Sequence, residues 1–194
     1  MHYIFGRSPK PGRWIDTHLG DIPGVRWSGW RKGARLALPP PDPLRFTLKP
    51  ISPHAADHSP HMPAFLNAAC PLFSDSLVQA LRECGVDNLD CYPALLAEPT
   101  SGEIVATYSA INVIGLVSAA DMSKSQAIVQ PGGPPSIDVS FDKLVIDATK
   151  AGETLFFRLA ESAATLIVHE SVKDFLVARG FDDLIFYLPE QVAT

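Results

Sequence analysis

The sequence has few cysteines and no long apolar run, and both absences narrow the class of protein that it encodes. Its three cysteines, Cys70, Cys84 and Cys91, are odd in number and form no CxxC pair. This argues against a disulfide framework and a zinc knuckle, so we expect three buried, reduced thiols. A membrane-spanning helix needs a run of about 18 apolar residues, and none occurs. The N-terminus also lacks the apolar segment of a secretory signal, so we expect a cytoplasmic protein.

Motifs that carry catalysis are missing as well. The phosphate-binding loops GxxxxGK[ST] and GxGxxG do not occur, and neither does the GxSxG motif of serine hydrolases. His169, Glu170 and Ser171 are adjacent, but neighbours in a first helical turn point in different directions, so this triplet indicates a helix start. The sequence therefore predicts a protein that is not an enzyme, with no catalytic residues, no metal and no cofactor.

A histidine cluster keeps one enzymatic alternative open. His54, Asp57, His58 and His61 fall within eight residues, and imidazole and carboxylate groups are ligands that zinc or nickel prefers. Neighbouring prolines leave room for only about one helical turn, and the HExxH motif is absent. We expect a polar loop here, and the alternative is a metal-dependent enzyme built on these four residues.

Charge and proline are unevenly spread along the chain. Residues 1–66 contain nine basic and four acidic residues, net +5, whereas residues 67–194 contain seven and seventeen, net −10. Eleven of the eighteen prolines also precede residue 67. Proline fixes φ and lacks a backbone donor, which disfavours sheet and long helix. We therefore expect a loop-rich, proline-rich N-terminal arm over residues 1–63, packed on a folded core over residues 64–194.

The expected arm contains all three tryptophans, which opens a second alternative. Trp14, Trp27 and Trp30 are interspersed with arginines, and aromatic rings beside cations can stack bases while the charges hold phosphates. The alternative is thus a nucleic-acid-binding module. We favour tryptophans that anchor the arm to the core, because their rings bury the most area and the whole chain is acidic.

Part of the chain occurs twice, at a spacing of 95 residues. Residues 73–92 (FSDSLVQALRECGVDNLDCY) align without a gap with residues 168–187 (VHESVKDFLVARGFDDLIFY). Each copy predicts a short amphipathic helix, a glycine that ends it, an aspartate-containing turn and an apolar strand. The first helix should span about residues 75–84, and His169 takes the N-cap place before the second. The identical pairs are Ser76/Ser171, Leu81/Leu176, Gly85/Gly180, Asp87/Asp182, Leu89/Leu184 and Tyr92/Tyr187.

The remaining apolar segments are typical of strands. Residues 104–117 and 137–146 are rich in β-favouring side chains, and shorter apolar runs follow at 155–159 and 165–168. The sequence therefore predicts an α+β fold: a mixed, mainly antiparallel sheet with two short helices from an internal helix-strand duplication, plus the N-terminal arm.

In this order, the motifs resemble those of a known family, the eleventh immunity family of bacterial polymorphic-toxin systems. The matching segments are FSDSLVQALRECGVDNLDCYPALL, INVIGLVSAADMSKS, LFFRL and LIVHESVKDFLVARGFDDLIFY, with a looser N-terminal match that includes WRKGARL and MPAFL. The resemblance covers most of residues 60–188. It implies a cytoplasmic protein that binds a cognate toxin encoded by a neighbouring gene and blocks it by stoichiometric occlusion, without turnover.

The acidic half of the chain suits such a role. Its net charge would complement a basic toxin such as a nuclease, and complementary charge speeds association and selects the partner. We predict partner contacts at Asp87, Asp90, Asp182 and Asp183, which turn chemistry should leave exposed at matching places in the two copies.

Three other polar residues of the matched motifs are expected to have structural roles. Asp121, Ser125 and Arg158 should satisfy buried backbone groups or form an internal pair. The sequence identifies neither the toxin nor the full contact surface or the oligomeric state. A surface that fits one partner is selected by shape and charge at scattered positions, so it leaves no local motif.

Overall fold

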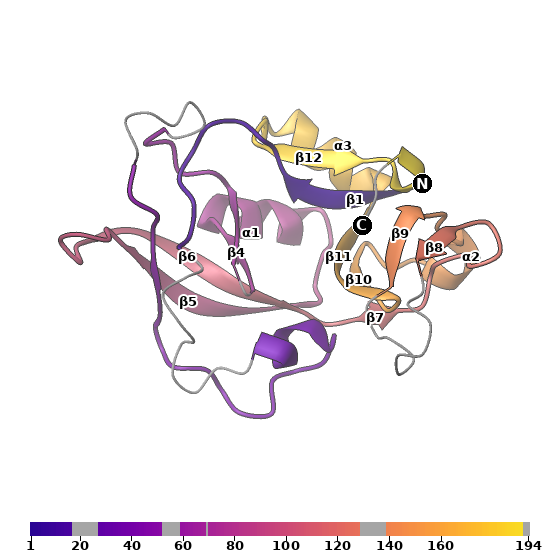
Figure 1. Cartoon of the computed structure of the whole chain (residues 1–194), viewed down its shortest axis with the longest axis horizontal. Coiled ribbons are helices and arrows are strands. Elements are labelled where there is room, and N and C mark those ends of the chain that lie inside the picture. The colour runs from indigo at the N-terminus through magenta and orange to yellow at the C-terminus, as the bar shows by residue number, and fades with distance from the viewer. Residues whose placement is uncertain (17–26, 52–58, 69, 129–138, 192–194) are drawn as a thin grey trace.

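The computed structural model describes residues 1–16, 27–51, 59–68, 70–128 and 139–191. Two five-stranded sheets, a two-stranded ribbon and three α-helices make up this part of the chain (Figure 1). The architecture is thus a strand-rich mixture of α and β structure with mainly antiparallel strands, as predicted. Two differences are that the strands form two large sheets where one was expected, and that a third, four-residue helix is present.

One large sheet is built around a long hairpin. Its order is β2 (Leu44–Thr47), β5 (Leu89–Ala97), β6 (Ile104–Val113), β4 (Pro71–Phe73) and β3 (Phe65–Asn67). We name it the β6 sheet after its central strand. β5 and β6 pair antiparallel along their whole length, β2 runs parallel to β5, and β4 and β3 continue antiparallel beyond β6.

The other large sheet brings together the two ends of the described chain. Its order is β12 (Leu184–Tyr187), β1 (His2–Arg7), β11 (Ser162–His169), β10 (Phe156–Leu159) and β7 (Leu116–Val117). We name it the β1 sheet. β1 pairs antiparallel with both β11 and β12, and the only parallel pair of this sheet is β10 with β7.

Smaller elements complete the described part of the chain. The two-stranded ribbon pairs β8 (Gln126–Ile128) with β9 (Ser140–Lys143), and the short helix α2 (Ala148–Ala151) follows it. Two 3-10 helices are η1 (Trp27–Arg31) and η2 (Pro189–Gln191). Among the described residues, no helix has the length and apolar character needed to cross a membrane.

The two longer helices form where the sequence predicts them. α1 (Asp75–Glu83) begins after Ser74, whose side chain accepts a hydrogen bond from the Leu77 amide. α3 (Glu170–Ala178) begins after His169, which accepts from the Ser171 amide in the same way. An ion pair between Arg179 and Glu83 connects the C-terminal ends of the two helices.

The two helix-strand regions match in detail. α1 and α3 begin and end 95 residues apart, and glycines with φ of 95° and 81° follow both, at Gly85 and Gly180. Positive φ costs glycine little, so each can end its helix. The strand register matches too: Leu89 pairs with Val113 and, 95 residues later, Leu184 pairs with Arg7. β1 therefore lies beside β12 as β6 lies beside β5, although it comes from the start of the chain.

The first residues differ from the loop-rich arm that the sequence predicts. His2–Arg7 forms a strand inside the β1 sheet, and β2 adds a further strand to the β6 sheet. The reason for the first difference is local, because the prolines begin only at Pro9 and leave the preceding amides free to pair. Residues before position 64 are thus part of both sheets.

An aromatic cluster connects the two sheets. Phe5 and Phe156 come from the β1 sheet, Phe65 and Phe73 from the β6 sheet, and all four are at most 5% exposed. The Phe5 and Phe65 rings stack at 5.4 Å between centroids, and Phe73 meets Phe5 edge-on at 5.8 Å. The apolar faces of α1 and α3 pack on the same cluster. This shared core fixes the position of one sheet against the other.

Candidate functional site

Three of the four predicted partner-binding aspartates reach the surface. Asp87, after α1, is exposed, and Asp90 is half-buried on β5. Asp182 occupies the place of Asp87 after α3 and is also exposed, with its carboxylate 2.8 Å from Lys10 Nζ. This contact lowers the pKa of Asp182, since the hydrogen bond and the charge of Lys10 both favour the carboxylate. A role for these three residues in binding stays a prediction.

The expectation that Asp183 is exposed is wrong. Its side chain is buried, with the residue only 7% exposed, and its carboxylate accepts a 2.6 Å hydrogen bond from the Ala64 amide. Its own carbonyl accepts a second hydrogen bond from the Ser8 amide at 2.9 Å. Two successive aspartates at a turn point in different directions, so Asp182 faces solvent while Asp183 faces the core.

Asn88 has the equivalent role in the first region, 95 residues earlier. Its amide donates to the carbonyls of Ile114 and Phe156, at 2.6 and 2.8 Å. Phe156 begins β10 of the β1 sheet, whereas Ala64 immediately precedes β3 of the β6 sheet. Each turn therefore binds the backbone of the opposite sheet. Asn88 and Asp183 hold the two halves together and are not free for a partner.

We expect Asp183→Ala to lower the free energy of unfolding by about 1–3 kcal/mol, because the Ala64 amide would be left buried without an acceptor. Chemical denaturation followed by circular dichroism measures this change. Asp182→Ala is the matched control, since it removes the adjacent carboxylate from an exposed position and should leave the midpoint nearly unchanged. Equal midpoints for the two variants would contradict the assignment.

The predicted histidine cluster falls mostly outside the described residues, which leave out His54, Asp57 and His58. His61 is described and exposed, with Nε2 3.4 Å from the Asp183 carboxylate. In the part of the chain that the structure describes, no group of three or more histidine, cysteine or acidic side chains is arranged to hold a metal ion.

All three cysteines are free thiols, as predicted, but only Cys70 is fully buried. Burial raises the pKa of the Cys70 thiol to about 12, so it stays protonated. Cys84 and Cys91 are partly exposed, which differs from the expectation. The pKa of each is nevertheless raised, chiefly by burial, so neither is an activated thiolate.

Two tryptophans of the expected arm pack against the rest of the protein. Trp30 is 1% exposed and meets the Tyr92 ring edge-on at 5.4 Å. Trp14 lies under the Arg7 guanidinium, 3.6 Å from its ring centroid. The side chain of Trp27 lies outside the described residues. Trp30 thus acts as the predicted anchor, whereas Trp14 stands at the edge of a cavity.

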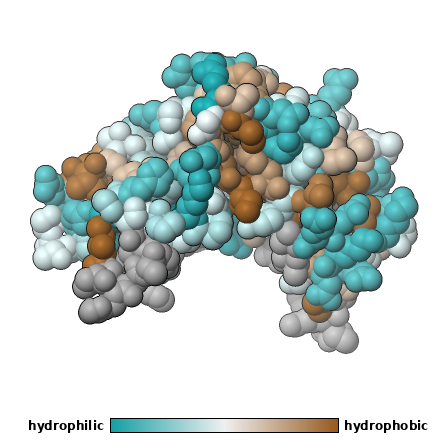
Figure 2. Space-filling view, turned by 90° about the horizontal axis from the view of Figure 1, so that it is seen from above, coloured by the Kyte–Doolittle hydropathy of each residue, from teal (hydrophilic) through white to brown (hydrophobic). Residues whose placement is uncertain are grey.

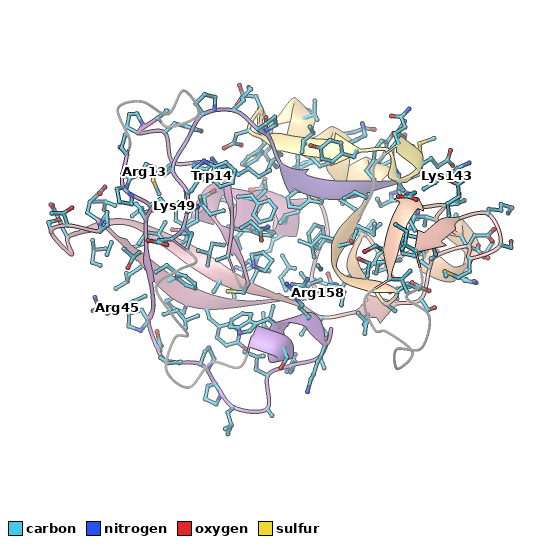
Figure 3. All side chains as sticks on the ribbon, viewed as in Figure 1. Arg13, Trp14, Arg45, Lys49, Lys143 and Arg158 are labelled. Atoms are coloured by element: carbon cyan, nitrogen blue, oxygen red, sulfur yellow. The ribbon has the colours of Figure 1, made fainter. Side chains whose placement is uncertain are left out.

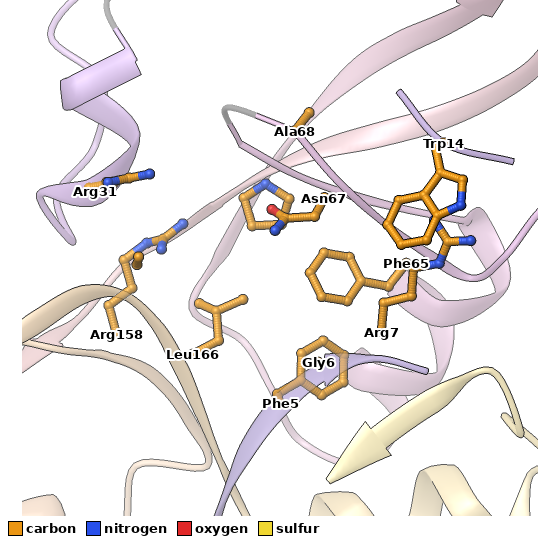
Figure 4. Close-up of a pocket in the computed structure, with 12 residues that line it drawn as sticks. Phe5, Gly6, Arg7, Trp14, Arg31, Phe65, Asn67, Ala68, Arg158 and Leu166 are labelled. Carbon is orange, nitrogen blue, oxygen red and sulfur yellow. The ribbon is translucent and has the colours of Figure 1, made fainter. Parts of the chain in front are cut away.

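This cavity lies between the two sheets and has a volume of about 350 Å³. Figure 4 shows Arg31 and Arg158 at one end, Arg7 with Trp14 at the other, and Asn67 between them. Phe5, Phe65 and Leu166 are among the apolar residues that complete its wall. None of the lining residues that the structure describes is acidic. Three arginines, Arg7, Arg31 and Arg158, thus line one cavity.

Arg158 is the most buried of these arginines, at 3% exposure. Its Nη1 donates to the Ala163 carbonyl at 2.9 Å, which confirms the expected backbone role, but its Nε has no partner among the described residues. Burial, and next the charge of Arg31, lower the pKa of Arg158 to about 10. The guanidinium still carries its charge at neutral pH.

The other two polar residues of the matched motifs also have internal partners. Ser125 Oγ accepts a hydrogen bond from the Val145 amide at 2.9 Å. Asp121 is bonded by Lys124 and Ser123, which together lower its pKa to about 2. Both agree with the structural roles predicted from the sequence.

Sequence reasoning missed the cavity as a site. Arg7, Arg31 and Arg158 belong to segments far apart in the chain, and no spacing rule connects them. One signal was present: Arg158 interrupts the apolar run LFFRL, and a charge in a buried strand needs a partner or a function.

No family model matches the chain, and no curated protein matches it. The resemblance to the immunity family therefore depends on the order and spacing of the motifs described above.

Proposed function

We propose that the protein is a bacterial immunity protein that binds a cognate polymorphic toxin in the cytoplasm and blocks it without catalysis. The motifs that resemble the family form one connected part of the structure. They supply α1 and nearly all of β5, the end of β6 with β7, then β10, the second half of β11, and α3 with β12. The segments that resemble the family thus form much of the core of the fold and of the surface around it.

The observation that carries the proposal is the charge exposed by this core. In the described part of residues 67–191, nine acidic side chains are exposed against four basic ones. The acidic residues are Asp75, Glu83, Asp87, Glu103, Asp142, Glu153, Asp174, Asp182 and Glu190, and the basic ones are Arg82, Lys124, Lys150 and Arg179. An acidic surface attracts a basic protein over several ångströms and orients it before contact.

The face that carries α3 and β12 fits a partner bound through charge and shape. Seen from above, hydrophilic residues flank a hydrophobic stretch at the centre of the view, and smaller hydrophobic spots lie to either side (Figure 2). Non-obligate interfaces are about as apolar as ordinary protein surface, so a mixed face of this kind can bind a separately folded toxin. Occlusion of the active or docking surface of the toxin would then protect the cell.

We further propose that the two helix-strand regions are copies of one ancestral unit. The shared bounds of α1 and α3, the matched strand register and the reciprocal bonds of Asn88 and Asp183 support this. On this account Asp87 and Asp182 are equivalent positions at which two similar surfaces meet the partner.

Co-expression tests the proposal. A toxin-like reading frame beside this gene is expressed under an inducible promoter, with or without this chain. We expect cells to survive induction only when the chain is present, and the two purified proteins to form a one-to-one complex. Undiminished killing with both proteins abundant, together with no complex in solution, would overturn the proposal.

A further inference from the structure

We propose that His2 and His169 make the junction between β1 and α3 sensitive to acid, so that protonation of the two imidazoles separates the first residues of β1 from the start of α3. This inference concerns the stability of the fold and does not depend on toxin binding. It rests on three observations: the contact between the two rings, the burial of His2 and the capping role of His169.

The two histidines face one another across paired strands. His2 is opposite His169 in the register of β1 and β11, and the two rings meet edge-on at 5.2 Å between centroids. The backbone connects the same two places, because the Glu170 amide donates a hydrogen bond to the Met1 carbonyl at 2.8 Å. The start of β1 is therefore bound to the start of α3 at the point where the two imidazoles meet.

A second proton on His2 would be buried without an acceptor. The residue is 6% exposed, and its Nε2 is buried without a hydrogen-bond partner in the part of the chain that the structure describes. The ring also meets the Phe157 ring edge-on, at 5.8 Å between centroids. Burial first, then His169 and then the N-terminal ammonium lower the pKa of His2 below its usual value. The fold therefore favours the neutral imidazole.

His169 needs an unprotonated nitrogen for its capping role. Its Nδ1 accepts a hydrogen bond from the Ser171 amide at 3.3 Å, and the Ser171 hydroxyl lies 2.9 Å from the same nitrogen. A protonated Nδ1 is a donor and cannot accept from the amide. The added charge would also stand at the N-terminus of α3, where the helix dipole disfavours a cation. Protonation thus removes the cap and places a positive charge at the helix start.

The first helix-strand region provides a comparison within the same chain. Ser74 caps α1 at the position equivalent to His169. A serine hydroxyl accepts the capping hydrogen bond without an ionisation near neutral pH, so this cap does not respond to mild acid. Mild acid should therefore act on the start of α3 and leave the start of α1 unchanged.

The carboxylates around the junction have partners of their own or face water. Glu170 begins α3, and its carboxylate lies 3.7 Å from the N-terminal ammonium and accepts a hydrogen bond from the Tyr3 hydroxyl at 3.3 Å. Glu190 of η2 lines the same cavity as His2 and is exposed. Asp147 lies between two other residues that line this cavity, and it caps α2. None of these contacts supplies an acceptor for His2.

The cations near the junction increase the cost of a further charge. The N-terminal ammonium already repels a proton from His2. Lys173 lies 5.1 Å from the centroid of the Tyr3 ring and pairs with Asp174. Arg13 and Lys49 lie beyond the opposite end of β1 (Figure 3), where the Arg13 guanidinium donates to the Lys49 carbonyl at 3.3 Å. Acid therefore adds charge to a junction that already carries a cation.

The expected loss of stability lies between about pH 7.5 and 5.5, where histidine side chains gain their charge and most carboxylates stay ionised. Because the pKa of His2 is lowered in the folded protein, the opened state binds more protons than the folded state once the pH falls below about 6.5. The stability that depends on the neutral ring is thus fully present above that pH and is lost as the solution becomes more acidic.

Amide hydrogen exchange of the full-length chain at the two pH values tests the inference, after correction for the intrinsic effect of pH on exchange. We expect protection at residues 2–4 and 171–173 to fall by about tenfold, because a histidine that is charged only in the opened state shifts the opening equilibrium by this factor one pH unit below its usual pKa. Protection at the matched residues 76–78 of α1 should change much less. Equal changes at the starts of α1 and α3 would overturn the inference.

Two substitutions show whether the histidines cause the response. His169→Ser introduces the cap that α1 has at Ser74, and His2→Phe keeps an aromatic ring beside Phe157 without a titrating group. Each should reduce the loss of protection at 171–173, and the double variant should show no larger loss than α1 does. Unfolding midpoints at about pH 7.5 verify that the variants fold.

His61→Gln is the matched control, because His61 is an exposed histidine near the Asp183 carboxylate and away from the junction contacts. This variant should keep the full response of the unchanged protein. A full response in the double variant, or a response abolished by His61→Gln, would overturn the inference. The measurements contain no toxin, so their failure leaves the proposed immunity function unaffected.

Discussion

Phe73→Ala should lower the free energy of unfolding by about 3–5 kcal/mol, the largest loss of stability that we expect from a single substitution. Phe73 is fully buried at the end of β4, and its ring contacts the rings of Phe5, Phe65 and Phe156. Truncation removes contacts to both sheets at once and leaves a cavity at their junction. Equilibrium denaturation in urea, with the free energy extrapolated to water, measures the loss.

Val177→Ala provides the comparison for this substitution. Val177 lies on the outer side of α3 and is 57% exposed, so the change removes little buried area and should leave stability close to that of the unchanged protein. A loss below about 1 kcal/mol for Phe73→Ala would mean that the aromatic cluster does not hold the sheets together.

The second large effect concerns association with the toxin. Replacing Asp87 and Asp182 together by lysine should slow association with a basic toxin by about tenfold or more at low salt, because attraction becomes repulsion at both matched turns. The difference should shrink as salt increases, since exposed charges are screened. Stopped-flow or surface-plasmon measurements of the association rate at two salt concentrations follow this effect.

A double variant with the same change in net charge separates local contact from overall charge. Asp142 and Glu153 are exposed, but we do not place them at the partner surface. Their replacement by lysine should slow association much less than the Asp87 and Asp182 pair. Equal slowing by the two double variants would show that only net charge matters, and the matched turns would lose their proposed role.

The helices were predictable because their signals are local. Ser74 and His169 cap the first turns, apolar residues recur at helical spacing, and Gly85 and Gly180 end the helices. Each feature acts within about one or two turns of the chain, so a linear reading captures it.

Strand partners were harder to predict because pairing is not local. β1 carries no sign that its neighbours are β11 and β12, whose residues lie more than 150 positions later. The same limit applies to the arginine cavity. Residues 7, 31 and 158 line one cavity only because the fold brings β1, η1 and β10 together.

The error at Asp183 has a different cause. Turn propensity predicts that an aspartate occupies a turn, but it does not say which of two successive aspartates faces the core. The burial of Asp183 depends on the Ala64 amide, which arrives from residues more than 100 positions earlier. Asp182 and Asp183 thus look alike in sequence and have opposite environments.

Titration of toxin activity with this protein tests the central claim most directly. If the protein acts by stoichiometric occlusion, toxin activity should fall linearly and vanish at one equivalent, with the same end point after longer incubation. Complete loss of activity at a small fraction of an equivalent would indicate turnover, and full activity in the presence of excess protein would indicate no inhibition. Either result would contradict the account.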